Sequence, residues 1–124
     1  MINFKNIDEV IKYLTNYNGE VKKEFLQPIY TSQKDFYKKA EIKTLDNNIK
    51  LLYSYNTLVC IIYNDNRYIL NDNINDKLLF SNTTLKHIKD FLLQNINILR
   101  LSHLIDNKIT KKDIIKNNNK RIGE

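Results

Sequence analysis

The sequence predicts an α+β fold in which a three- or four-stranded antiparallel meander packs against a C-terminal helix. Runs rich in β-branched and aromatic residues, separated by short Asn/Asp turns, extend from Ile49 to Leu70. After a polar segment, apolar residues recur at helical spacing between Thr83 and Gln94. We expect N-terminal helices and a basic helical tail to flank this core.

The length of 124 residues predicts a single domain with one modest core. Three parts are expected within it: an N-terminal helical extension at 1–31, the α+β core at 32–94 and the tail at 95–124. The sequence has no signal peptide and no apolar run near the roughly 20 residues that a membrane span needs. We therefore expect a cytoplasmic protein of a bacterial host cell, with no membrane contact.

The N-terminal part begins with a helix start. Asn6 can cap free backbone amides, and Glu9 follows three residues later. Apolar residues then recur at helical spacing: Ile7, Val10, Ile11 and Leu14. The helix is expected to end near Asn16–Gly19, and a second short helix to cover Val21–Leu26 before Pro28 stops it.

The core is expected to begin with Phe36 and Tyr37 as anchors, followed by a short edge strand over 41–45. The Asn/Asp-rich turn at 46–48 separates this strand from the meander. The strands of the meander are expected at 49–55, 58–63 and 67–70.

The C-terminal half is expected to be helical. The helix from Thr83 to Gln94 has one apolar face: Leu85, Ile88, Phe91, Leu92 and Ile96. A further helical segment is predicted from Ile98 to Ile105, and Thr110 with Asp113 can cap a last short helix through Ile115. Residues 116–124 are expected to fray.

A first polar motif interrupts the strand pattern at Ser54, Asn56 and Thr57. We interpret these side chains as structural, satisfying backbone groups at a bulge or bend and latching the meander to the helix start. Direct contact with a ligand is the alternative.

A second polar motif opens the long helix with Ser81, Thr83 and Thr84, which are candidate caps. A sharper alternative is that this helix start, with its free amides and Lys86, binds an anion such as a nucleic-acid phosphate.

Histidine and cysteine do not predict a catalytic or metal site. His87 is expected to be oriented by Thr83 or Asp90, and a lone histidine gives no metal site. Cys60 stands in an apolar run, which favours a small buried side chain over a nucleophile paired with His87. We therefore expect no enzyme activity and no cofactor.

The net charge of +6 is concentrated in the tail, where residues 95–124 carry seven basic and three acidic side chains. This excess is interpreted either as a solvated terminus or as a contact surface for phosphate or an acidic protein. The candidate basic contacts are Lys86, Lys89, Lys111, Lys112, Lys116, Lys120 and Arg121.

Eight tyrosines and five phenylalanines are present, and Tyr53, Tyr55, Tyr63 and Tyr68 fall on the predicted sheet, where aromatic and basic side chains together suit stacking on a single strand. Strand packing is the favoured interpretation. Tyr55 and Tyr68 are candidate contacts, because aromatic residues also stack on single-stranded bases and serve protein interfaces.

The order of motifs resembles a known family. Phe36-Tyr-Lys-Lys-Ala40, Leu52-Tyr-Ser-Tyr-Asn-Thr-Leu-Val59 and Ser81-x-Thr-Thr-Leu-Lys-His-Ile-Lys-Asp-Phe-Leu92 are similar to a small domain of unknown function in accessory proteins of bacteriophages and mobile elements of low-GC bacteria. The resemblance covers about half of the chain and implies a phage-type origin and a fold. Lys38 departs from it, because glycine is expected there.

These observations predict a phage or mobile-element accessory protein that acts by stoichiometric binding. Its most concrete version is an inhibitor of a host defence system, of the anti-CRISPR type, whose partner is a host protein or ribonucleoprotein effector complex. The alternative is a nucleic-acid-binding accessory or regulatory module that uses the basic tail. The sequence does not indicate an oligomeric state.

Overall fold

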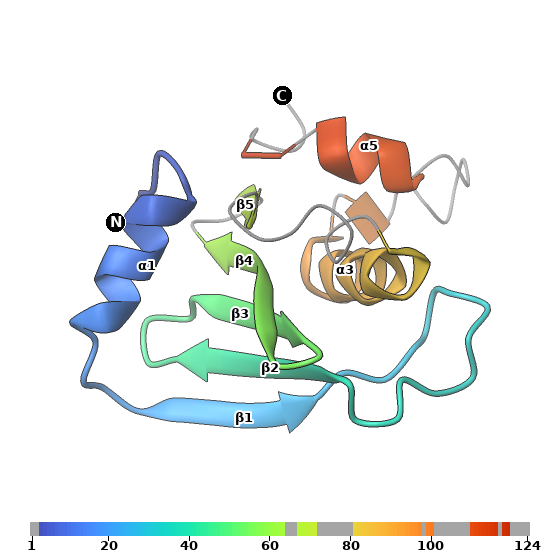
Figure 1. Ribbon diagram of the computed structural model, residues 1–124, viewed down its shortest axis with the longest axis horizontal. Coiled ribbons are helices and arrows are strands. Elements are labelled where there is room, and N and C mark those ends of the chain that lie inside the picture. Colours follow the sequence, from blue (N-terminus) through green and yellow to red (C-terminus); the bar gives the residue numbers. More distant parts are fainter. Residues whose placement is uncertain are drawn as a thin grey trace.

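The fold is a five-stranded antiparallel sheet with helices on both faces (Figure 1). The computed structural model describes residues 3–63, 67–71, 81–97, 99–100, 110–116 and 118–119. Its elements are α1 Ile7–Thr15, β1 Val21–Phe25, β2 Ala40–Leu45, β3 Lys50–Ser54, β4 Thr57–Tyr63, β5 Arg67–Leu70, α3 Asn82–Asn95 and α5 Lys111–Lys116. The predicted α+β class is confirmed.

Every strand pairs with its neighbours in sequence, in the order β1-β2-β3-β4-β5. The predicted meander is therefore correct, although it has five strands. The fifth is β1, for which we predicted a helix over Val21–Leu26. That prediction is wrong, because the backbone of β1 pairs with β2 along its whole length and this pairing overrides a weak local pattern. The expected edge position of β2 is also wrong, since β2 lies between β1 and β3.

Helix α1 covers one face of the sheet. Its predicted start is confirmed, because the Asn6 side chain accepts a hydrogen bond from Glu9 N at 3.1 Å. The Glu9 carboxylate in turn accepts from Lys5 N at 2.8 Å. Ile7 and Val10 are buried against residues of all strands except β1: Leu45, Leu51, Ile61, Tyr63 and Ile69.

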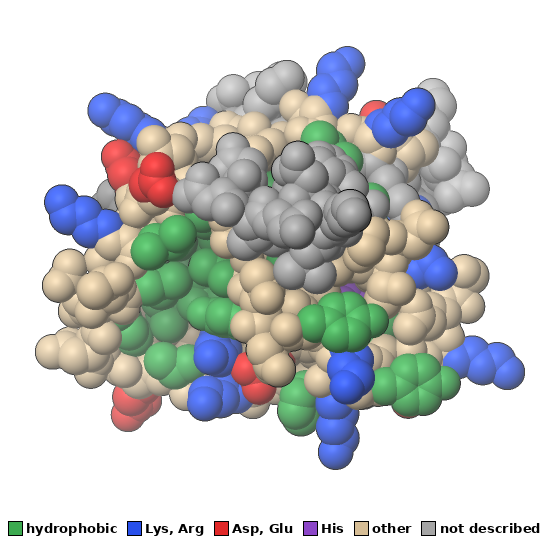
Figure 2. Space-filling model, viewed as in Figure 1, with side chains coloured by type: hydrophobic (Ala, Val, Ile, Leu, Met, Phe, Trp, Pro, Cys, Tyr) green, Lys and Arg blue, Asp and Glu red, His purple; other side chains and the backbone are tan. Residues whose placement is uncertain are grey.

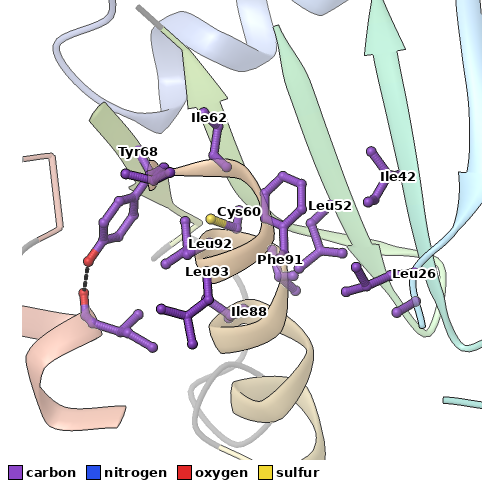
Figure 3. Close-up of a cluster of buried hydrophobic side chains, with 14 of the residues drawn as sticks. Leu26, Ile42, Leu52, Cys60, Ile62, Tyr68, Ile88, Phe91, Leu92 and Leu93 are labelled. Carbon is purple, nitrogen blue, oxygen red and sulfur yellow. Dashed lines mark hydrogen bonds between the residues drawn. The ribbon is translucent and has the colours of Figure 1, made fainter. Parts of the chain in front are cut away.

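Helix α3 packs on the opposite face and builds the larger core (Figure 3). Side chains from α3 meet Ile42, Leu52 and Cys60 from the central strands. Leu26, which continues the pairing of β1 by donating from its N to Ala40 O at 2.8 Å, closes one side. Phe36 is also buried in this cluster, as predicted.

The C-terminal segment is part of the core. Thr110 and Asp113 cap α5 as predicted, with Thr110 N donating to the Asp113 carboxylate at 2.8 Å. Ile114 is 2% exposed. The expected fraying is wrong for Asn118, whose Oδ1 accepts a hydrogen bond from Leu70 N at 2.8 Å. Of the residues in that prediction, 117 and 120–124 lie outside the described residues. Of the preceding predicted helix, residues 98 and 101–105 do as well.

Candidate partner-binding face

A tight turn precedes β2. Lys39 N donates to Phe36 O at 2.9 Å, and the two residues between them have φ of 52° at Tyr37 and 61° at Lys38. This is the geometry of a type I′ turn, in which both central residues occupy the left-handed region. Tyr37 is 70% exposed, so its predicted role as a core anchor is wrong.

A second tight turn joins β3 and β4. Ser54 pairs with Thr57, and Tyr55 and Asn56 have φ of 51° and 67°. The first polar motif is therefore a two-residue hairpin turn. Tyr55 N donates to Lys39 O at 2.8 Å, so the two turns lie side by side at one end of the sheet.

The two turns and the strands beside them form a continuous surface, which we call the twin-turn face. It contains a hollow of about 350 Å³. The face consists of Phe25, Tyr37, Lys38, Lys39, Glu41, Lys43, Tyr53, Tyr55 and Asn56. Phe25 and Tyr55 are 47% and 46% exposed. In Figure 2, hydrophobic and lysine side chains lie side by side along the lower edge of the view, where Figure 1 has β1.

The sheet part of this face is open because α1 is too short to cover it. At about 1.5 Å per residue, a helix of nine residues spans about 13 Å. Strand alternation places Glu41 on the α1 side of the sheet, as it does Leu45, but only Leu45 is buried beneath the helix. Phe25 and Tyr53 flank Glu41 on the neighbouring strands, forming a row across three strands.

Lysines contact two rings of this face, the exposed Phe25 and the half-buried Tyr53. The Lys38 ammonium lies 5.8 Å from the Phe25 ring centroid, and the Lys43 ammonium lies 4.3 Å from that of Tyr53. Lys43 also lies 3.9 Å from the Glu41 carboxylate. Burial, with a smaller contribution from Glu41, raises the pKa of Tyr53, so its hydroxyl stays protonated at neutral pH. The face therefore offers aromatic and cationic groups together.

A buried polar cluster holds the second turn against α3. Ser54 Oγ lies 2.8 Å from His87 Nδ1 and 3.2 Å from Thr84 Oγ1, and all three residues are fully buried. The predicted structural latch between the two polar motifs is confirmed for these residues. Asn56 and Thr57 contribute to the turn that the latch supports.

His87 lies behind the twin-turn face. Its ring packs edge-on against Phe36 at 4.5 Å and lies 5.8 Å from the ring of Tyr55. Among the described residues, none forms a hydrogen bond with its buried Nε2. Desolvation lowers the pKa of His87 to about 4, although the nearby Asp90 carboxylate partly opposes this shift. The imidazole is therefore neutral at pH 7.

The predicted orientation of His87 by Thr83 or Asp90 is wrong, because Ser54 supplies its hydrogen bond. Thr83 is half-buried. The Asp90 carboxylate instead accepts from Ile29 N at 2.9 Å, which fixes the loop before the first turn onto α3.

Comparison with protein families matches a family of unknown function, DUF8033, to residues 25–117. The chain belongs to this family. No match was found among curated proteins or among solved structures. The DUF8033 region begins at the exposed Phe25 and includes both turns, β2 to β5, α3 and α5, whereas α1 lies outside it. No helix in the described part of this DUF8033 protein has the length and hydrophobicity needed to cross a membrane.

The second polar motif acts as a helix cap in this DUF8033 fold. Ser81 Oγ accepts a hydrogen bond from Thr84 N at 3.2 Å, which confirms its predicted capping role. Anion binding at the same helix start, with half-buried Lys86, stays a prediction.

The other predicted contacts lie at scattered positions. Tyr68 is wrong as a contact residue, because it is 1% exposed and its hydroxyl donates to Ile114 O at 2.6 Å. Lys89 is half-buried on α3, whereas Lys112 and Lys116 are exposed on α5. Lys111 begins α5, and Lys120 and Arg121 lie outside the described residues.

Sequence reasoning missed most of the twin-turn face. Phe25 was assigned to a helix, and Tyr37 to the core. One signal in the sequence pointed to the first turn. The resemblance predicts glycine at the position of Lys38, and glycine at such a position indicates a left-handed backbone conformation. Tyr55 was predicted as a partner contact, and Tyr53 was one of the sheet tyrosines considered for stacking on a single strand.

Replacing Lys38 by glycine is expected to stabilise the DUF8033 domain. A side chain in the left-handed region costs about 1–2 kcal/mol, which glycine avoids at some entropic cost. Lys38→Gly should raise the free energy of unfolding by about 0.5–1 kcal/mol in urea denaturation, which is the difference between these two effects. Lys39→Gly is the matched control, since Lys39 lies outside this region and the same change should destabilise by a similar amount. Equal effects of the two changes would contradict the turn assignment.

The Cys60 thiol is expected to be unreactive in the folded protein. Its side chain is fully buried, and burial raises the pKa of the thiol further above neutrality. A thiol-specific chromogenic reagent should label Cys60 slowly in buffer and rapidly in denaturant. Fast stoichiometric labelling of the folded chain would revive the nucleophile interpretation.

Proposed function

We propose that this protein acts by stoichiometric binding as an accessory protein of the phage or mobile-element type. Its target in this proposal is a host defence effector, in the manner of an anti-CRISPR protein acting in the bacterial cytoplasm. The twin-turn face is the proposed contact surface. Its exposed aromatic rings are the observation that carries the proposal.

Backbone strain supports a binding role for this face. Tyr37, Lys38 and Tyr55 all occupy the left-handed region, which is unfavourable for bulky residues. Their side chains are exposed, so little core packing offsets the strain. Strained residues of this kind persist mainly where they serve recognition.

The latch supports binding rather than turnover. Ser54 and His87 form a hydrogen-bonded pair that resembles a nucleophile with its base, but both side chains are fully buried. A nucleophile must be reachable by its substrate. In this proposal the pair holds Tyr55 in place for a partner.

Inhibition can be tested by measuring phage plaquing on bacteria with an active RNA-guided defence system. Expression of the wild-type protein should restore plaquing by the targeted phage. The variant Tyr55→Asn removes the ring and introduces a residue that type I′ turns favour, so it should fold and fail to restore plaquing. Ile29→Ala is the matched control, because Ile29 is 65% exposed and lies in the loop bound to α3. A wild-type protein without effect on each system tested would refute the inhibitor proposal.

A nucleic-acid-binding accessory or regulatory role is the second candidate. The exposed Lys112 and Lys116 on α5 favour it. Double-stranded DNA affinity should then decrease steeply with salt, and Lys112→Ala with Lys116→Ala should reduce that salt dependence. Salt dependence unchanged in this double variant would refute binding through α5.

A further inference from the structure

We propose that the twin-turn face binds a single strand of nucleic acid. This inference rests on the proposed function and names the component of the host nucleoprotein that this same face contacts. Sequence-tolerant binding of single strands requires aromatic platforms for the bases and cations for the phosphates. Both lie on this face, and none of its lysines belongs to the basic tail or to α3, on which the nucleic-acid alternative rests.

The aromatic platform crosses the sheet and continues onto the second turn. Phe25, Glu41 and Tyr53 occupy adjacent positions on β1, β2 and β3. Neighbouring strands lie about 4.8 Å apart, so the backbones of Phe25 and Tyr53, which are two strands apart, are separated by about 10 Å. Tyr55 lies in the second turn and lines the same hollow, and its ring lies 5.8 Å from that of His87 on α3. Platforms of this kind on other sheets stack two or three bases, and the spacing here suits a similar number.

The charge of the face is complementary to a phosphate backbone. Lys38 and Lys39 are exposed, and among the described residues no carboxylate forms a salt bridge with either of them. Glu41 is the one acidic member of the face, and it already pairs with Lys43 at 3.9 Å. Three lysines and one glutamate leave a net positive surface around the rings.

The type of cation and the position of the rings define the ligand further. Lysine acts as a compact point charge, whereas bidentate recognition of base edges is typical of arginine. The face therefore suits backbone tracking with little base preference. Its rings can stack only on bases whose faces are accessible. In a duplex, the faces of the bases are covered by the neighbouring base pairs. A single strand consequently fits this face better than a duplex does.

Fluorescence anisotropy with a labelled oligothymidine of about 12 nucleotides tests the inference with the full chain. We expect binding that weakens with salt, and weaker binding of a duplex of equal length. Tyr55→Asn should reduce affinity about 5- to 150-fold, because base stacking on one ring contributes about that factor. Circular dichroism and urea unfolding of this variant should show an intact fold, which separates lost stacking from misfolding.

Charge variants locate the strand on the protein. Lys38→Ala, Lys39→Ala and Lys43→Ala should each reduce the slope of log affinity against log salt by about 0.7. Ile29→Ala and Lys112→Ala, at residues that do not line the hollow of the face, should leave both affinity and slope unchanged. If Lys112→Ala changes the slope of log affinity against log salt and Lys43→Ala does not, the strand does not bind at the twin-turn face.

The outcomes distinguish this inference from the proposed function. If oligothymidine does not bind, while Tyr55→Asn still abolishes inhibition in the plaquing assay, the partner is a protein and the nucleic-acid inference is wrong. If oligothymidine binds through Tyr55 and the wild-type protein never restores plaquing, the inhibitor proposal is wrong and the single-strand site stands.

Discussion

Truncation of the chain before Thr110 is expected to unfold it or to reduce its free energy of unfolding by about 5 kcal/mol. The truncation removes Ile114, whose burial contributes about 2–3 kcal/mol. It also removes the acceptors of the Tyr68 hydroxyl and of Leu70 N, and the loss of each hydrogen bond costs about 0.5–1.5 kcal/mol. The total is comparable to the whole stability of many domains.

Urea unfolding monitored by circular dichroism measures this effect. Lys112→Ala and Lys116→Ala are the matched controls, because both side chains are exposed on α5 and each change should alter stability by at most about 0.5 kcal/mol. A truncated chain with an unchanged unfolding midpoint would show that α5 does not contribute to the core. Truncation is expected to change the stability of the fold, whereas removal of the lysine charges is not. Only the charge variants therefore test a binding role for this segment.

Acidification is expected to destabilise the protein through His87. Burial lowers its folded-state pKa to about 4, below the ordinary value of 6.5. Between these pH values the unfolded chain binds the proton and the folded one does not, so stability rises with pH. The contribution of His87 is complete above pH 6.5 and is lost as the pH falls toward 4. A shift from 6.5 to about 4 corresponds to about 3 kcal/mol.

The variant His87→Asn isolates this contribution. It should be less stable than the wild type by roughly 1–3 kcal/mol at pH 7, because the ring and its hydrogen bond to Ser54 are altered. Titration of carboxylates affects both proteins, so their difference reports on His87 alone. That difference should decrease as the pH falls from 6.5 to 4. A difference independent of pH would mean that the imidazole titrates normally in the folded protein.

The sequence predicted the parts of the fold that local signals determine. The long helix was predicted within one residue at each end, because Ser81 is a strong cap and the apolar spacing is regular. Strand β1 was missed, since all five of its residues are exposed and its pairing with β2 is invisible in the local pattern. Packing of α5 was missed for a related reason, because it depends on distant partners such as Tyr68.

The candidate site was predictable only in its buried half. Ser54, Thr84 and His87 were chosen because polar side chains interrupted apolar patterns, and their proximity confirms the latch. The exposed half depends on backbone conformation at Tyr37 and Lys38, which residue types do not favour. Composition and hydrophobic periodicity therefore do not predict which side chains two left-handed turns bring together.

The latch and the exposed face act together in this account. His87 packs beneath the Tyr55 ring, and Ser54 joins it to the strand that ends at this turn. The buried motif therefore fixes the position of a side chain proposed to contact the partner. The region matched to DUF8033 includes both the motif and the turns.

The central claim, that the twin-turn face is the binding surface, is tested most directly by affinity capture from host lysate with and without nuclease. Wild-type protein, the double variant Tyr55→Asn with Lys43→Ala, and the control Ile29→Ala are compared side by side. We predict that wild type and control retain the same effector complex, that the double variant loses it, and that nuclease weakens retention. Equal retention by all three proteins would contradict the claim.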